Sequence, residues 1–301
     1  MIDLVCYAPR LPRRGETLHG TKFSIGHGGK GANQCVAAAK LGASTSLIAR
    51  LGDDSFGKEY LKSLKELGIN TDNVILTPLK SSGMAQITVS ESGDNHIVIV
   101  AGANDLLSVE DIRASQNMIE EAKVVIFQFE TPLSTTVNTL QLLKDSSGKP
   151  VSIVNGAPAL DHLDSKIFPL CDIFCVNESE AGAILREDVD SVENATHAAK
   201  KFLQLGCNTV IITLGSKGAV FATENSKIGH VPAQSVTPVD TTGAGDAFIG
   251  ALAYFTAFMG QLPLSERIRR SCVVASTSVL RAGTQISFPN KMDLPEELFV
   301  S

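Results

Sequence analysis

The chain has 301 residues, of which 44% are hydrophobic and 19% charged, a composition typical of a soluble globular protein. Its formal net charge of −6 argues against a nucleic-acid partner, which usually requires a basic face. The sequence has no run of 18 apolar residues, and its start has no basic stretch followed by an apolar one. We therefore expect neither a membrane span nor a signal peptide.

Six cysteines are scattered along the chain without a C-x-x-C pair, and most of them lie in apolar runs. This pattern is typical of reduced thiols in a protein core. Because reduced thiols are usual inside cells, we expect a cytoplasmic protein, with a nuclear location left open.

The first segment of the chain is short of branched aliphatic residues. Only Ile2, Leu4 and Val5 precede Pro9, which is too few for a buried central strand. Asp3 lies among them and is predicted to be a surface acid, with a ligand at a strand end as the alternative. Residues 15–25 alternate weakly between apolar and polar types, which predicts one or two strands.

A glycine-rich loop at residues 26–33 lies between those strands and a predicted helix. Gly26, Gly28 and Gly31 satisfy G-x-G-x-x-G, so an NAD-binding oxidoreductase is one alternative. The preceding strand has polar residues at alternate positions, however, unlike the buried strand of that motif. We favour a loop that grips the hydroxyls of a polyol through its backbone and Asn33.

Two further β segments are expected before residue 101. Residues 46–51 form an apolar run that predicts a buried strand, and Asp54 is placed to cap the amphipathic helix that follows. Residues 85–100 alternate in two runs, which predicts an antiparallel hairpin. Because a hairpin does not fit a parallel sheet, we assign it with residues 15–25 to a small separate sheet. Such a sheet would cover a substrate site, a second subunit or both.

From Ser108, which forms a predicted capping box with Asp111, strands and helices alternate. This order predicts a parallel sheet with helices on both faces, in which ligands bind at the carboxyl ends of the strands. Each polar residue at those ends could cap a helix, but their shared position favours one joint site. These residues are Glu130, Asn155, Asn177, Glu178, Glu180 and the loop 213–218.

The stretch 239–248 places small residues between two acids, directly before an apolar helix. Gly243, Ala244 and Gly245 would leave backbone N–H groups free at the start of that helix, which creates an anion site. Asp246 falls in the first helical turn. Free amides beside a carboxylate that can accept a proton are suited to phosphoryl transfer. The alternative is a glycine-rich loop with an N-capping Asp.

Several motifs together resemble the ribokinase-like carbohydrate kinase family over nearly the whole chain. Residues 28–34 read GGKGANQ, the form found in the ribokinase branch of that family, and residues 240–246 read DTTGAGD. Further matches lie at 52–57, 101–104, 177–180 and 213–218. The resemblance implies an α/β fold, a three-layer α/β/α kinase domain over residues 1–301 with a mostly parallel central sheet. It also implies a small β-sheet lid at about residues 10–26 and 83–100.

The reaction that the resemblance implies is the ATP-dependent phosphorylation of D-ribose at O5. Asp246 would be the base that takes the hydroxyl proton, and the amides of Gly243, Ala244 and Gly245 would hold the charge on the transferred phosphoryl group. The family's sugar-binding positions match Asp246 and, in addition, Asp3, Gly29, Lys30, Gly31, Ala32, Asn33 and Glu130.

Nucleotide and cation sites are implied by the same resemblance. The ATP site maps to Asn177, Thr213, Leu214, Gly215, Ser216, Lys217, Gly218, Gly245, Asp246 and Cys272. Glu180 matches a position associated with Mg²⁺ placement through water. A monovalent cation, usually K⁺, would lie beside the anion hole, with ligands at Asp240, Thr242, Ser278, Arg281, Gly283 and Ser287, several of them through carbonyl oxygens.

The implied lid would close over the sugar and exclude water, and pairing of two lids would give a homodimer. The family's first strand and its N-x-D motif fall before or at the start of this chain, where Asp3 matches the motif's Asp and Met1 its Asn. We therefore expect the central sheet to lack that strand. The alternatives to an active ribose kinase are a weakly active or inactive binding form and a kinase for a related sugar such as deoxyribose.

Overall fold

Six strands form the central sheet among the residues that the computed structural model describes, which are 1–92, 94–160 and 163–300. The four strands β7 to β10 are parallel, and β11 and β12 extend the sheet in antiparallel pairs. The predicted mostly parallel sheet is confirmed. Its order is β12-β11-β10-β9-β8-β7, with bounds β7 Val124–Phe127, β8 Val151–Asn155, β9 Ile173–Asn177, β10 Thr209–Thr213, β11 Ala219–Thr223 and β12 Ile228–Val231.

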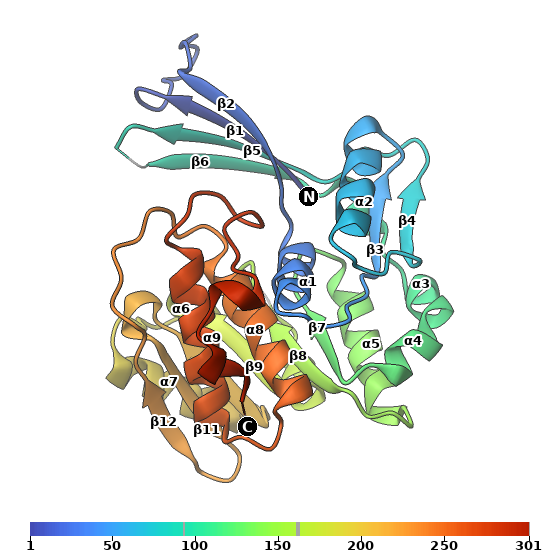
Figure 1. The fold of residues 1–301 in the computed structure, drawn as a ribbon, viewed down its shortest axis with the longest axis vertical. Coiled ribbons are helices and arrows are strands. Elements are labelled where there is room, and N and C mark those ends of the chain that lie inside the picture. Colours follow the sequence, from blue (N-terminus) through green and yellow to red (C-terminus); the bar gives the residue numbers. More distant parts are fainter. Residues whose placement is uncertain (93, 161–162, 301) are drawn as a thin grey trace.

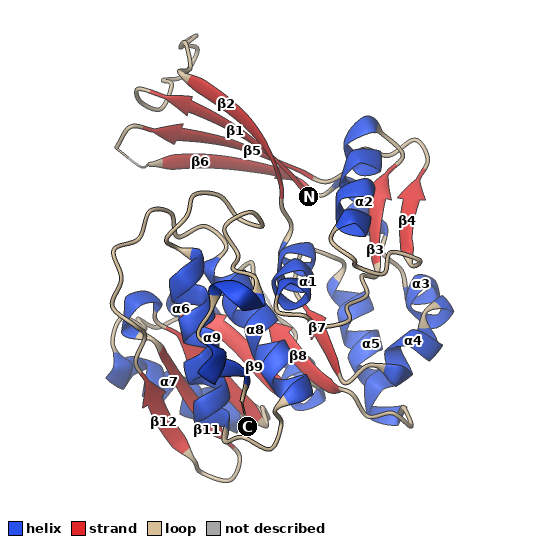
Figure 2. Cartoon of the chain, in the orientation of Figure 1, coloured by secondary structure: helices blue, strands red, loops and turns tan. Residues whose placement is uncertain are grey.

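Helices cover both faces of this sheet (Figures 1 and 2). Alternate strand residues enter two apolar clusters, since Val154 packs on one face with Phe202 and Ile153 on the other with Leu252. The predicted three-layer α/β/α fold is therefore confirmed. One face carries α5 (Leu133–Asp145), α6 (Glu178–Leu185) and α7 (Val192–Gln204), and the other carries α8 (Ala244–Phe258) and α9 (Leu264–Ser278), with α1 (Lys30–Lys40) packed against α8.

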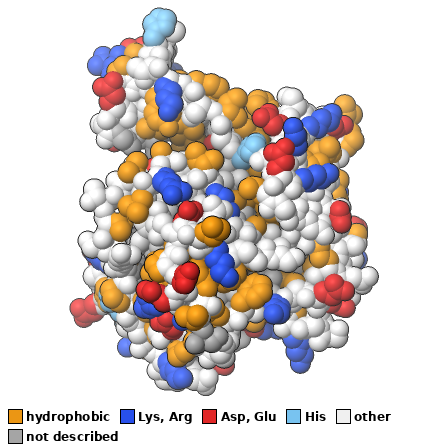
Figure 3. Space-filling view, viewed as in Figure 1, with side chains coloured by type: hydrophobic (Ala, Val, Ile, Leu, Met, Phe, Trp, Pro, Cys, Tyr) orange, Lys and Arg blue, Asp and Glu red, His pale blue; other side chains and the backbone are white. Residues whose placement is uncertain are grey.

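A second sheet projects from one end of the molecule (Figure 1). Its hairpin is the predicted one, and its separation from the central sheet is confirmed. Hydrophobic side chains gather on this lid sheet (Figure 3), and Phe23, Ile25 and Ile97 are more than half exposed. The strand order is β2-β1-β5-β6, with bounds β1 Ile2–Ala8, β2 Lys22–His27, β5 Met84–Ser90 and β6 Asn95–Val100.

The composition of the lid sheet differs from the prediction in two ways. Residues 2–8 form a strand in its interior, because β1 pairs antiparallel with β2 and parallel with β5. Residues 10–21, which were expected to begin the lid, lie outside its strands. Pairing on both sides satisfies the backbone groups of β1, so long-range contacts place this segment in the lid sheet.

β3 (Ala49–Gly52) and β4 (Val74–Thr77) form a separate parallel pair beside α2 (Ser55–Glu66). The predicted strand at 46–51 therefore begins three residues later, whereas the predicted cap is confirmed, because Asp54 accepts a 2.7 Å hydrogen bond from the Gly57 amide. A cavity of about 570 Å³ lies between β3 and β7 and is lined by α1, α5 and α8 as well. All four residues of β7 are apolar yet only partly buried, so β7 is an open edge of the central sheet.

The helical segment that lies between β6 and β7 in the sequence begins where expected but is interrupted. The capping box of Ser108 and Asp111 is confirmed. The single helix predicted to follow it is instead two short ones, α3 (Val109–Ala114) and α4 (Gln116–Glu121), which meet at Ser115. The expectation of reduced thiols also holds, since all six cysteines are free and five are buried.

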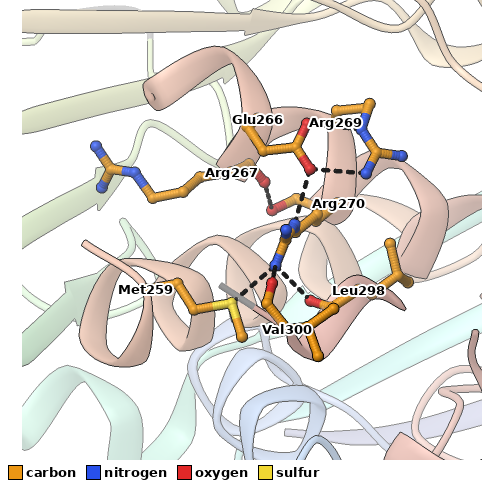
Figure 4. A network of polar contacts seen from close by, with 8 residues as sticks. Met259, Glu266, Arg267, Arg269, Arg270, Leu298 and Val300 are labelled. Carbon is orange, nitrogen blue, oxygen red and sulfur yellow. Dashed lines mark hydrogen bonds and ion pairs between the residues drawn. The ribbon is translucent and has the colours of Figure 1, made fainter. Parts of the chain in front are cut away.

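The last residues of the chain are tied to α9 by one buried arginine (Figure 4). The Arg270 guanidinium donates to the carbonyl oxygens of Leu298 at 2.8 Å and Val300 at 2.9 Å, and its Nε donates to Glu266 at 2.8 Å. Hydrogen bonds from Arg269 and then Arg270, against the opposing effect of burial, lower the pKa of Glu266 to about 2. This network fixes the segment that packs beneath α8 and α9.

Candidate active site

A pocket of about 180 Å³ lies at the carboxyl ends of β8, β9 and β10 and at the start of α8. Strand ends of a parallel sheet are where ligands usually bind in such folds. The pocket brings together residues expected to bind sugar, nucleotide, phosphoryl group and Mg²⁺. Its lining is Lys30, Asn155, Ala157, Cys175, Val176, Asn177, Glu180, Thr213, Gly243, Gly245, Asp246, Phe248 and Ile249.

The start of α8 has the form of an anion site. Gly243 is the N-cap residue at φ 78°, a left-handed conformation that favours glycine, and a Cβ atom there would lie 2.6 Å from the Thr284 side chain. The Ala244 amide donates to the Thr241 carbonyl at 3.2 Å, whereas no bond of this kind from Gly243 or Gly245 is found in the described chain. Two amides thus remain available at the positive end of a 15-residue helix.

Asp246 is a buried carboxylate in the first turn of α8, 8% exposed. Asn33 Nδ2 donates to Oδ2 of Asp246 at 2.9 Å, and Gln34 Nε2 donates to Oδ1 at 2.9 Å. Burial raises the pKa of Asp246, and the positive charge of Lys30 with the two amide donors opposes that rise. A raised pKa and a fixed orientation both suit a group that must accept a proton.

The glycine-rich loop lies between two further acids. The Lys30 amide donates to Glu130 Oε2 at 2.7 Å, which ties the start of α1 to the loop after β7. A Cβ on Gly28 would collide with the Asp3 carboxylate, so that glycine allows β1 to approach the loop. Burial raises the pKa of Asp3 to about 6; the Met1 amino group opposes this, and Glu130 and Asp246 add to it.

Asp3 is therefore not the surface acid that the sequence favoured. It belongs to the inner face of the glycine-rich loop, together with Gly29, Lys30 and Glu130. Gly31 and Ala32 continue this surface into the first turn of α1, where both border the cavity between β3 and β7. A group of carboxylates and backbone amides gathered around one short loop can bind several hydroxyls of a polyol.

Asn177 and Glu180 form a capping box at the start of α6. The Glu180 amide donates to Asn177 Oδ1 at 2.8 Å, and the Asn177 amide donates to Glu180 Oε2 at 2.9 Å. Burial raises the pKa of Glu180, while the Asn177 amide and Lys30 oppose it. Both residues line the pocket, so the helix cap also places one carboxylate next to the start of α8.

The other residues expected to bind the nucleotide differ in how far they are exposed. Gly215–Lys217 form a short 3₁₀ turn after β10, where Lys217 donates to the Asp190 carbonyl at 2.6 Å, and the turn closes through a 2.7 Å bond from the Leu214 amide to the Gly218 carbonyl. Ser216 is exposed on this turn. Cys272 is instead in the apolar cluster with Ile249, where burial raises its pKa to about 12, and it is not among the residues lining the pocket.

The residues expected to bind K⁺ surround the loop before α8. Asp240 accepts from the Thr242 amide at 2.9 Å and from the Gly283 amide at 2.8 Å. Burial opposes ionisation of Asp240, but these bonds hold its pKa below the usual value. The Ser278 and Ser287 hydroxyls donate to backbone carbonyls at 2.8 Å each. Arg281 has an exposed side chain, so only its backbone carbonyl could serve as a ligand.

Three amide side chains of the site were not predicted, of which Gln34 and Gln285 are buried and Gln128 is partly buried. Gln34 bonds to Asp246, Gln128 donates to Gln34, and Gln285 donates to Asn33 Oδ1 at 2.9 Å and to the Tyr60 hydroxyl at 2.6 Å. The signal for Gln34 was its place on the apolar face of the predicted helix, directly after Asn33. A polar residue at such a position is normally hydrogen-bonded.

The described residues contain neither a cluster of metal ligands nor a membrane-spanning helix. In residues 1–92, 94–160 and 163–300, no three His, Cys, Asp or Glu side chains are gathered where they could hold a metal ion. Within the same ranges, every helix is too short or too polar to cross a bilayer.

Known proteins resemble this chain over nearly its whole length. Residues 1–291 match the pfkB family of carbohydrate kinases. The chain is 44% identical to a ribokinase of Mus musculus over 300 residues, 99% of this chain and 92% of the mouse protein. It is 39% identical to a deoxyribokinase of Salmonella typhi over 290 residues, 96% of this chain and 93% of that protein.

The fold also matches a solved structure of Arabidopsis thaliana ribokinase complexed with ribose and ATP. The TM-score is 0.89 and the sequence identity 28%, over all of this chain and 96% of the other. The α/β fold and the lid sheet agree with these matches. The chain is an enzyme of the pfkB family of carbohydrate kinases.

Proposed function

We propose that this kinase transfers the γ-phosphoryl group of ATP to O5 of D-ribose, in line and without a covalent enzyme intermediate. The observation that carries the proposal is the buried carboxylate of Asp246 beside the free amides of Gly243 and Gly245, in one pocket with Lys30. Asp246 takes the proton of the attacking hydroxyl, and the amides at residues 243–245 stabilise the charge on the transferred group. For Ala244 this requires its amide to leave the Thr241 carbonyl.

Ribose is the substrate that the sugar side of the site fits. Asp3, Glu130 and Asn33 present oxygen and amide groups around the glycine-rich loop, in a space bounded by the lid sheet. The mouse relative is a ribokinase, and the Arabidopsis enzyme binds ribose and ATP. The nucleotide then lies along Asn177, Thr213 and the 215–218 turn, with its γ-phosphate toward Gly245.

The donor atoms at both proposed cation sites suit the cations that we assign to them. Glu180 adds one carboxylate to the pocket besides Asp246, which suits Mg²⁺ held mainly by water and ATP phosphates. Asp240, the Ser278 and Ser287 hydroxyls and nearby carbonyls form an all-oxygen set, which suits a hard cation such as K⁺. Mg²⁺ would neutralise charge on the phosphates, and K⁺ would add positive potential near the anion site.

The lid sheet gives a reason to expect a homodimer. Phe23 and Ile25 of β2 share one face of the sheet with Val98 and Val100 of β6, as the strand register shows. All four are more than half exposed, and an apolar sheet face of this kind is stabilised when a second copy covers it. We propose one kinase domain over residues 1–301 with this lid closing on the sugar. We also place the enzyme in the cytoplasm, since its six cysteines are free.

The test is turnover by the purified protein with ATP, Mg²⁺ and K⁺ on ribose, deoxyribose and fructose. We expect ribose to give the highest kcat/KM, and Asp246→Asn to lower kcat by at least about 10²-fold because the base is lost. Substantial turnover by Asp246→Asn would refute the role of Asp246. A higher kcat/KM for deoxyribose would instead favour the second candidate, a deoxyribose kinase. The similarity to the Salmonella deoxyribokinase supports this candidate.

A weakly active or inactive binding form is the remaining candidate. The observation that favours it is the cavity of about 570 Å³ between β3 and β7. This cavity borders Gly29 of the glycine-rich loop and Glu130 after β7. Thermal unfolding distinguishes this form: ATP or ribose would raise the melting temperature while no phosphorylated sugar appeared. Turnover on any sugar of the panel would exclude the inactive form.

A further inference from the structure

Gln34 is completely buried at the centre of a chain of amide side chains. Gln128, directly after β7, donates its Nε2 to Gln34 Oε1 at 2.7 Å. Gln34 Nε2 in turn donates to Asn155 Oδ1 at 3.0 Å and to Asp246 Oδ1 at 2.9 Å. Asn155 Nδ2 then donates to the Cys175 carbonyl at 3.2 Å. The chain thus connects the residue after β7, the end of β8 and the middle of β9 to α1 and to Asp246.

The direction of every amide in this chain is determined by its neighbour. The Cys175 carbonyl can only accept, so Asn155 must direct its Nδ2 toward it and its Oδ1 toward Gln34. Gln34 must then present its NH₂ group to Asn155, which also directs it to Asp246. A rotated Gln34 amide would place Oε1 against both the Asp246 carboxylate and Asn155 Oδ1, with no donor between them.

Gln34 and Asn33 bind different oxygens of the same carboxylate. Gln34 holds Oδ1 and Asn33 holds Oδ2, each at 2.9 Å, from consecutive positions of α1. Two amide donors on separate oxygens restrict rotation of the carboxylate and still leave a lone pair on each oxygen for a substrate hydroxyl. They also favour the ionised form, which is the form that can accept a proton.

We propose that Gln34 is a positioning residue that orients the Asp246 carboxylate and keeps it ionised for catalysis. The proposal rests on the proposed function, because Asp246 must be the base. Other charged groups face Asp246 as well: Lys30 from α1, Glu130 from the loop after β7, Glu180 from α6 and Asp3 from β1. Their contributions stay in place when Gln34 is replaced by a neutral residue.

Gln34→Met tests this role, because methionine has a similar length and no polar hydrogen. Loss of a hydrogen bond to a charged group should raise the pKa of Asp246 by about one pH unit. The acid limb of the kcat/KM profile should move up by the same amount, so that activity on that limb falls about tenfold while activity at high pH falls less. Gln34→Glu should move the limb further, because a second acid would then lie against Asp246.

Gln128→Met is the matched control, since it removes a partly buried amide of the same chain that does not touch Asp246. We expect some loss of melting temperature and a much smaller movement of the acid limb. An unchanged acid limb in Gln34→Met, with kcat lowered equally at all pH values, would show a purely structural role and overturn the proposal. An equal shift in Gln128→Met would overturn it too.

A second measurement separates this proposal from the proposed function. Infrared titration of ¹³C-aspartate-labelled protein, with Asp246→Asn as the difference reference, reads the Asp246 carboxylate without turnover. A higher titration midpoint in Gln34→Met than in the unsubstituted protein supports the positioning role, and equal midpoints refute it. Full activity of Asp246→Asn would refute the base instead, whatever the infrared result.

Discussion

Replacing Asp3 with asparagine should make the unliganded protein more stable at neutral pH and a poorer sugar kinase. Burial raises the pKa of the Asp3 carboxyl to about 6, from 3.8 in the unfolded chain. The described residues include no hydrogen-bond donor to this carboxylate, and Glu130 and Asp246 add to its unfavourable environment. Asparagine has nearly the same shape and no charge, so Asp3→Asn removes the cost of ionisation.

The magnitude follows from the two pKa values. Above pH 6 the carboxyl is ionised in both states, and the difference corresponds to about 3 kcal/mol of stability lost by the folded protein. Below pH 6 the folded state keeps its proton while the unfolded chain loses it, so the loss shrinks as the pH falls. It should be about 1.5 kcal/mol at pH 5 and about 0.5 kcal/mol at pH 4.

Urea unfolding of both proteins between pH 4 and pH 8 measures this difference directly. The advantage of Asp3→Asn should rise with pH and level off above pH 7. Asp105→Asn, which removes an exposed carboxylate, is the control and should stay within about 0.5 kcal/mol at all pH values. The reasoning is refuted by an advantage that does not depend on pH. In the kinase assay, we expect the KM for ribose to rise roughly tenfold or more, since a charged acceptor is lost.

Three further predictions concern other parts of the fold. Asp240→Ala removes one hydrogen bond within the loop, from the Thr242 amide, and one that joins the loop to Gly283; turnover should lose its response to K⁺, and an unchanged K⁺ titration would contradict the assigned site. Arg270→Met should lower the free energy of unfolding by about 3 kcal/mol, against under about 1 kcal/mol for Arg269→Met at the exposed pair with the same acid; equal losses in urea would contradict the role of the buried guanidinium. Five apolar residues engineered before Met1 should raise the melting temperature by pairing with β7 and β3, unlike a five-residue extension of serines; equal melting curves would show that the cavity between those strands does not accept a strand.

The regular parts of the fold could be predicted because local and long-range forces agree there. From residue 108 on, apolar runs of strand length alternate with amphipathic helices. Along the whole chain, caps such as Asp54 and Ser108 mark where helices begin. The pocket could be anticipated for the same reason, since polar residues follow β8, β9 and β10 at one edge of the sheet. Asn155, Asn177 and Thr213 were found by that position alone.

Other features depend on contacts that the sequence does not display. β1 has only three branched aliphatic residues, Ile2, Leu4 and Val5, and its place in the lid sheet depends on pairing with β2 and β5. β12 (Ile228–Val231) likewise depends on β11, and its four residues carry no clear period. Asp3 looked like a surface acid because two of its neighbours in space, Gly28 and Glu130, are distant in sequence.

The cavity between β3 and β7 divides the candidate site into two halves of different rigidity. Asp246, Asn177 and Glu180 belong to elements packed in the large apolar clusters on both faces of the central sheet, so their positions are fixed by many contacts. Gly29 and Glu130 border the cavity, and β1, which carries Asp3, reaches the main body through Ile2 and Leu4, which pack in a smaller apolar cluster with residues of α1 and α2. A segment beside a cavity has fewer packing contacts and therefore a lower local stability. Any change in how this cavity is filled should therefore act on sugar binding before it acts on the nucleotide or on Asp246.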